Sequence, residues 1–169
     1  MNIKKSILYT GIIVLFVILQ STVLSEIRIM GVRPDFTLIF LVFFSHVTGP
    51  MHGKIIGFIV GLLKDFLSLA PFGFHGIIDT TIGHIYGFTR EKVYIDPITI
   101  PLLLAVSATV IKALGSFVLF ALFLPENLPS VFGVNFLIEI AMNGVAAPFI
   151  YALLRVSGLV KERTHTMFG

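Results

Sequence analysis

The sequence predicts an all-α integral membrane protein, in which six transmembrane helices form one compact bundle with both termini in the cytoplasm. Composition is the first reason: 56% of the 169 residues are hydrophobic and only 12% are charged, whereas a soluble domain carries about 25% charged residues. The second reason is that apolar segments follow one another along the chain with short polar stretches between them. We therefore expect residues 1–169 to form a single membrane-embedded domain.

The apolar segments are the expected helices, and their lengths differ. The candidate spans are residues 6–24, 34–47, 54–69, 72–88, 97–124 and 131–154. A span needs roughly 17–25 residues, so the second, third and fourth segments are predicted from apolar character more than from length. The first segment also fits a signal peptide because Lys4 and Lys5 precede it, but no small-residue cleavage site follows, which favours a retained helix.

Basic residues predict the orientation, since positively charged loops stay in the cytoplasm. One side of a six-span chain carries Lys4, Lys5, Lys54, Arg90, Lys92, Arg155, Lys161 and Arg163. The other side carries only Arg28 and Arg33. The four tyrosines fall near the basic side, where amphipathic rings favour the interface. The net charge of +3 is small and lies at segment ends, so nucleic acid is not an expected partner.

The third segment carries Gly57, Gly61 and Asp65 at intervals of four residues, which places them on one helix face. A GxxxG pair lets another helix approach closely. The face therefore contacts either a partner protein or simply a neighbouring helix of the same chain. Lys64 lies about 100° around the helix from Asp65, and we expect its long side chain to reach outward to the membrane surface.

The fourth segment has a second small-residue face, formed by Gly83 and Gly87. It also carries a charge, Asp79, within its apolar stretch, four residues after His75 and therefore within hydrogen-bonding reach on one face. His84 differs from these two in angle and depth. We expect neither a metal site nor a cofactor here, and the glycine face again has packing as its simpler interpretation.

The last two segments carry Lys112 and Glu139 within their apolar stretches. Charges in hydrocarbon are costly and usually turn inward in pairs, so these two residues are expected to pair across helices, either structurally or as part of a functional site. Asn143 shares a face with Glu139. Because Pro148 has no N–H to donate to the carbonyl of Gly144, a kink is expected there.

Sequence signatures of catalysis are missing. The chain has no Cys, no H-E-x-x-H, no G-x-S-x-G, no P-loop and no glycine-rich dinucleotide fingerprint. The outward loops, at residues 25–33, 70–71 and 125–130, are too short to hold a folded domain. The sequence therefore predicts a protein that is not an enzyme and that acts within the membrane or at its surface.

Three segments together carry a family resemblance. They are V-R-P-D-F at 32–36, the run G-F-I-V-G-L-L-K-D-F-L-S at 57–68 with P-F-G-F at 71–74, and N-G-V-A-A-P at 143–148. In this order the chain resembles the rod shape-determining protein MreD family over most of its length. Lys64 departs from the family pattern, in which an apolar residue usually precedes the aspartate.

The resemblance implies a non-enzymatic scaffold subunit of the bacterial cell-elongation complex, placed in the inner membrane. Its implied partner is MreC, and through the complex also MreB filaments, a RodA-type glycosyltransferase and a class B penicillin-binding transpeptidase. Membrane lipid and a second copy of the chain are further candidate partners.

A second interpretation is the substrate-binding membrane subunit of an energy-coupling-factor vitamin transporter, which is also a six-helix protein of similar size. Such a binder needs an enclosed cavity with convergent polar groups. A scaffold is instead expected to have a closed interior and an apolar lateral face. A membrane enzyme is the third and least favoured interpretation, because the catalytic signatures are missing.

Overall fold

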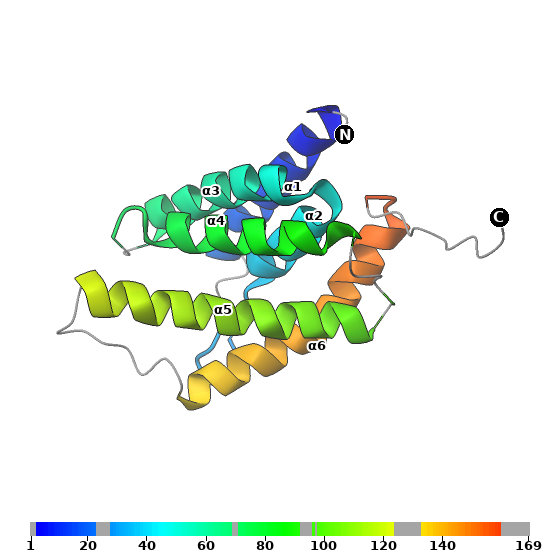
Figure 1. Cartoon of the computed structure of the whole chain (residues 1–169). Coiled ribbons are helices and arrows are strands. Elements are labelled where there is room, and N and C mark those ends of the chain that lie inside the picture. The colour runs from blue at the N-terminus through cyan, green and yellow to red at the C-terminus, as the bar shows by residue number, and fades with distance from the viewer. Residues whose placement is uncertain are drawn as a thin grey trace.

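The computed structural model describes residues 3–22, 28–68, 71–91, 96, 98–123 and 133–159, and this part of the chain is helical. Figure 1 shows the helices in space; they are α1 (Ile3–Thr22), α2 (Phe36–Thr48), α3 (Pro50–Leu67), α4 (Phe74–Gly87), the short 3₁₀ helix η2 (Phe88–Glu91), α5 (Thr99–Phe123) and α6 (Val134–Val156). Within the described ranges no strand is present beyond one isolated bridge between Ile29 and Val32. The predicted all-α architecture with six α-helices is confirmed.

The helix bounds differ from the predicted spans most clearly at the start of α3. That helix begins at Pro50, so Lys54 lies inside it and not in a loop. Proline suits the first turn of a helix because a backbone N–H at that position would have no intrahelical acceptor, so its absence costs nothing. Gly49 alone joins α2 to α3, with φ of +91°, a conformation that glycine adopts without a steric cost.

The helices differ in length. α5 and α6, with 25 and 23 residues, are long and apolar enough to cross a membrane, and α2 and residues 7–22 of α1 are shorter apolar stretches. At about 1.5 Å per residue, the 13 residues of α2 extend over less than the roughly 30 Å of a hydrocarbon core. The length of α2 is explained by its place inside the protein.

α2 is the centre of the core. Its buried side chains point in every direction around the helix and include Leu38, Phe40, Phe43 and Phe44. A helix that is apolar all round is expected to be enclosed by protein or lipid, and α2 packs against all five other α-helices. In Figure 1 it lies behind the α3–α4 pair, with α5 and α6 below that pair.

Contacts at the two ends of the bundle show that α1 and α2 run in opposite directions. At one end the hydroxyl of Tyr9, near the start of α1, donates to the carbonyl of Leu159 after α6 at 2.8 Å, and its ring stacks on Phe44 near the end of α2. At the opposite end Gln20 Oε1 accepts from Thr37 N at 2.9 Å. The start of α1 and the ends of α2 and α6 therefore share one end of the molecule.

Candidate functional site

The glycine face of α3 packs against α4 inside the chain. A Cβ atom at Gly57 would overlap the backbone carbonyl of Asp79, and one at Gly61 would overlap that of His75. Gly83 lies equally close to the backbone of Gly53. The two helices lie side by side along their length (Figure 1), so the close approach that GxxxG permits is used within the protein.

The other predicted small residues also lie at backbone contacts or helix contacts. A Cβ at Gly87 would overlap Pro50 at the start of α3, and one at Gly144 would lie 3.2 Å from Val106 Cγ2 of α5. α6 continues through Pro148 as one helix and bends along its length in Figure 1. Gly144 thus packs against α5, and Pro148 lies one turn further along α6.

Asp65 holds the start of α4. The side chain is buried and accepts hydrogen bonds from the backbone N–H groups of Gly73, His75 and Gly76 at 2.9, 2.9 and 3.1 Å. A carboxylate suits this place because the first N–H groups of a helix have no intrahelical acceptor. His75 Nδ1 also lies 2.8 Å from Asp65 Oδ1. The suggested pairing of His75 with Asp79 is therefore wrong, because the imidazole of His75 hydrogen-bonds to Asp65.

Five ionisable side chains from five segments meet inside the bundle; we call Asp35, Lys64, Asp79, Lys112 and Glu139 the buried charge cluster. Lys64 Nζ lies 2.9 Å from Asp79 Oδ2 and 3.7 Å from Asp35 Oδ1. Lys112 Nζ lies 2.9 Å from Asp35 Oδ2 and also pairs with Glu139. The predicted pairing of Lys112 with Glu139 is present, with Asp35 as a second partner.

The predicted direction of the Lys64 side chain was wrong. Its side chain was expected to reach outward, but it is only 14% exposed and points to Asp35 and Asp79. The cause is the packing of α3, which carries Lys64 on the side that faces the start of α2 and the middle of α4. Two buried carboxylates at that place attract the ammonium more strongly than the distant membrane surface.

Asp35 is the hub of the cluster. It precedes α2, and its Oδ1 accepts from Leu38 N at 3.0 Å, which caps that helix. Its own backbone N–H donates to Asn143 Oδ1 at 2.8 Å, and Asn143 Nδ2 donates to Thr109 Oγ1 at 3.0 Å. Asn143, which is fully buried, thereby joins α6 to the start of α2 and to α5.

Sequence reasoning missed the role of Asp35. The residue appeared only in the V-R-P-D-F segment, and its position before an apolar helix is a recognisable N-cap signal. That signal predicts the bond to Leu38 but not the two lysines, which come from distant helices. Spatial neighbours from separate helices leave no mark in the spacing of a single sequence.

The cluster joins the α5–α6 hairpin to the rest of the bundle. Asp35, Lys64 and Asp79 come from the α2–α4 region, whereas Lys112 and Glu139 come from α5 and α6. Ion pairs in a low-dielectric interior fix the relative position of the elements that carry them. The site therefore determines how two parts of a helical bundle fit together.

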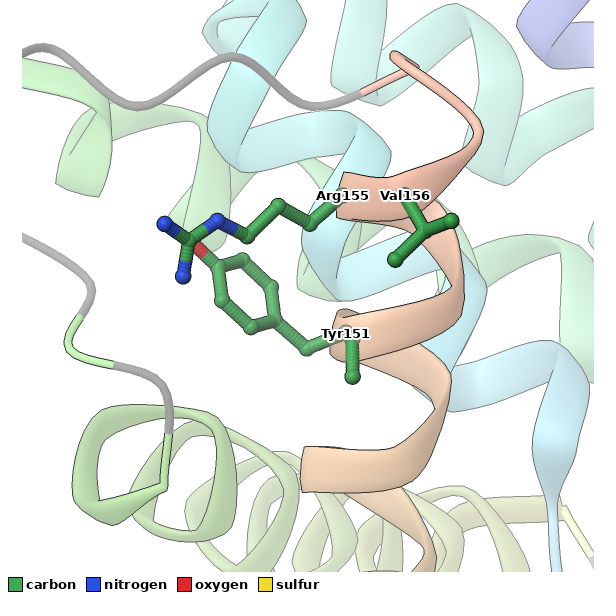
Figure 2. A pocket seen from close by; sticks show the side chains of 4 residues that line it. Tyr151, Arg155 and Val156 are labelled. Atoms are coloured by element: carbon green, nitrogen blue, oxygen red, sulfur yellow. The ribbon is translucent and has the colours of Figure 1, made fainter.

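A separate hollow of about 370 Å³ lies at the far end of α6, lined by Tyr151, Ala152, Arg155 and Val156. Figure 2 shows the Tyr151 ring and the Arg155 side chain lying alongside each other, both projecting from the last turns of α6. Tyr151 is twelve residues beyond Glu139, which is about 18 Å along a helix. All four lining residues come from one helix, so the hollow is a recess on α6 and not part of the charge cluster.

The described residues form a helical bundle that holds a charge cluster and has two helices long and apolar enough to cross a membrane, which are features of the integral membrane class of helical proteins. The family model described as rod shape-determining protein MreD matches residues 2–157, and the chain belongs to this family. No curated protein and no solved structure matches it. Membership assigns the chain a role in determining rod shape, in a family of shape-determining structural proteins that are not known as enzymes.

Proposed function

We propose that this chain is a non-enzymatic scaffold subunit of the cell-elongation complex in the bacterial inner membrane. In this role it binds MreC and helps couple MreB filaments in the cytoplasm to a RodA-type glycosyltransferase and a class B penicillin-binding transpeptidase. The observation that carries the proposal is the family match over residues 2–157. The absence of catalytic sequence signatures described above supports a binding role.

The proposed topology has six spans with both termini in the cytoplasm. Two observations support it. The hydrogen bond from Tyr9 to Leu159 puts the start of α1 and the end of α6 at the same end of the bundle. Arg90, in η2 after α4, donates to the carbonyl of Thr48 at the end of α2, so this basic residue lies at the same end, as expected of a cytoplasmic face.

The outer faces of the helices support lateral binding. Large apolar side chains remain exposed on α3 and α4, among them Phe58 at 52% and Phe66 at 72%. Such faces suit lipid chains or membrane helices of a partner. Since Gly57 and Gly61 are used in the α3–α4 contact, a partner helix is expected to bind through these outer side chains and not through the glycine face.

Co-purification from membranes tests the proposal. Tagged MreC, solubilised in a mild detergent, should retain this chain in amounts well above those of an unrelated multi-pass protein expressed to the same level. Substitution of an outer-face residue, Phe58→Ala, should leave the amount of folded protein unchanged, since the side chain is half exposed. Failure of MreC to retain the folded wild-type chain would contradict the proposal.

The vitamin-transporter alternative makes a different prediction. The α6 hollow is lined by one helix, and the charged groups in the bundle bind one another, so neither provides the enclosed polar cavity that a vitamin needs. Equilibrium dialysis of the purified chain with radiolabelled water-soluble vitamins should show no saturable binding. Saturable binding at submicromolar vitamin would favour the transporter.

A further inference from the structure

The charges of the buried charge cluster do not balance. With every group ionised, Asp35, Asp79 and Glu139 contribute three negative charges, and Lys64 and Lys112 contribute two positive charges, which leaves one negative charge in excess. An uncompensated charge inside a membrane protein is costly, and a buried group commonly becomes neutral instead. A proton on one carboxyl group would make the cluster neutral.

Asp35 and Glu139 are poor candidates for that proton. Asp35 lies beside both ammonium groups and accepts the backbone N–H of Leu38 at the start of a helix, and each of these partners favours the carboxylate. Glu139 pairs directly with Lys112 and remains 22% exposed. The partners of Asp35 therefore favour its ionised form, and Glu139 already has a cation as its direct partner.

Asp79 has the weakest set of partners. Its side chain is only 1% exposed. Lys64 Nζ lies 2.9 Å from Oδ2 but also faces Asp35 at 3.7 Å, and Oδ1 has no hydrogen-bond partner among the described residues. Asp79 thus shares its one cation and is the most deeply buried of the three carboxyl groups.

The other ionisable groups close to Asp79 in the described part of the chain, His75 and Asp65, bind each other. His75 lies one turn earlier on α4, and its imidazole is held by Asp65. Asp65 is itself bound by three backbone N–H groups, so these two residues form a separate pair. Among the described residues, the ionisable groups that act on Asp79 are Lys64, Asp35 and, one turn earlier on α4, His75, with Lys112 and Glu139 behind them.

We propose that Asp79 is a proton-binding site, whose carboxyl group holds one proton within the buried charge cluster at neutral pH. The proton sits on Oδ1, which has no hydrogen-bond partner among the described residues, while Oδ2 still faces Lys64. Binding adds one proton to a carboxylate and forms a neutral acid. Lys64 and Lys112 are then matched by Asp35 and Glu139. This inference does not depend on the partners proposed above.

Infrared spectroscopy of the purified chain in detergent tests the proposal directly. The wild-type protein at neutral pH should show the C=O stretching band of a protonated carboxyl group, and that band should shift when the protein is labelled with aspartate carrying ¹³C in its side-chain carboxyl group. Asp79→Asn should remove the band. The control Asp96→Asn, at an exposed position, should retain it. A band that survives Asp79→Asn, or no such band in the wild type, would overturn the proposal.

Thermal unfolding gives an independent test, because asparagine resembles a protonated aspartate in shape and charge. Asp79→Asn should change Tm by less than about 4 °C. Lys64→Met, which returns an excess negative charge to the cluster, should lower Tm by roughly 6–20 °C and shows that the assay is sensitive to charge. A larger loss for Asp79→Asn than about 4 °C would mean that Lys64 needs an ionised Asp79, and the proposal would fail.

Discussion

At the scale of single residues, the buried charge cluster makes the loss of Lys112 and the loss of Glu139 unequal in their effect on stability. Considered alone, Lys112 and Glu139 form a pair in which either loss leaves one bare charge. The structure adds Asp35, 2.9 Å from Lys112 Nζ. Lys112 therefore has two carboxylate partners, whereas Glu139 has one cation among the described residues. The lysine should matter more for stability than the glutamate.

We predict that Lys112→Met lowers the free energy of unfolding by about 3–5 kcal/mol, because it leaves two buried carboxylates short of a cation. Glu139→Gln should cost less, since Lys112 keeps Asp35. The double variant should recover only part of the loss, because Asp35 then has Lys64 alone at 3.7 Å. Thermal unfolding of the four versions in detergent measures these values. Equal losses for the two single variants would contradict the role of Asp35.

Asn143 is the second residue for which the structure makes a sharp prediction. Asn143→Ala leaves the backbone N–H of Asp35 without its acceptor, and an unsatisfied buried group costs about 1–3 kcal/mol. The amount of folded protein in membranes and its Tm should both fall. Asn135→Ala, on an exposed part of the same helix, is the matched control. No difference between the two variants would show that the bond from α6 to Asp35 is unimportant.

At the scale of helices, the α3–α4 contact depends on the absence of side chains. Gly57 and Gly61 allow the backbone of α4 to lie directly against α3. A side chain there cannot be accommodated by a small rotation of a neighbour, because the overlapping atoms belong to the backbone. The helices would have to separate, and the ion pair between Lys64 of α3 and Asp79 of α4 would break.

We predict that Gly61→Leu strongly reduces the amount of folded protein, whereas Gly11→Leu has little effect. Nothing lies within 4 Å of a Cβ built at Gly11, so the same substitution in α1 meets open space. Detergent-resistant monodisperse protein, measured by fluorescence size-exclusion chromatography, reports the difference. If both variants behave like the wild type, the close approach of α3 and α4 does not occur in the membrane.

At the scale of the whole molecule, the proposed topology places the start of α1 and the ends of α2 and α6 on the cytoplasmic side. A reporter that is active only in the periplasm should be silent when it is fused after Gly169. Activity of that fusion would contradict the cytoplasmic C-terminus and with it the count of six spans.

The adjacency of Tyr9 and Leu159 can be measured separately. Because the chain contains no Cys, Tyr9→Cys with Leu159→Cys introduces one pair of thiols. A short bismaleimide should join them within one molecule, since the Tyr9 hydroxyl lies 2.8 Å from the Leu159 carbonyl. The pair Tyr9→Cys with Ser68→Cys, at opposite ends of the bundle, should not react in this way. The reverse pattern would refute the arrangement of the helices.

Much of the architecture follows from the sequence itself. Apolar composition and segment length predict helices, because backbone groups in a bilayer must bond within their own segment. The family resemblance also followed from local motifs, and the match over residues 2–157 confirms it. The bounds of α3 were less predictable, since Pro50 starts that helix four residues earlier than its apolar pattern suggests.

What the sequence by itself determined was which residues are charged within apolar helices; which of them meet was decided by the tertiary structure. Lys64 and His75 show the reason. Each had an apparent partner or direction on its own helix, yet Lys64 turns to Asp35 and Asp79, and His75 turns to Asp65. A side chain inside the bundle binds whichever complementary group the packing of other helices brings within reach, and for a lysine in a low dielectric that attraction outweighs local preference.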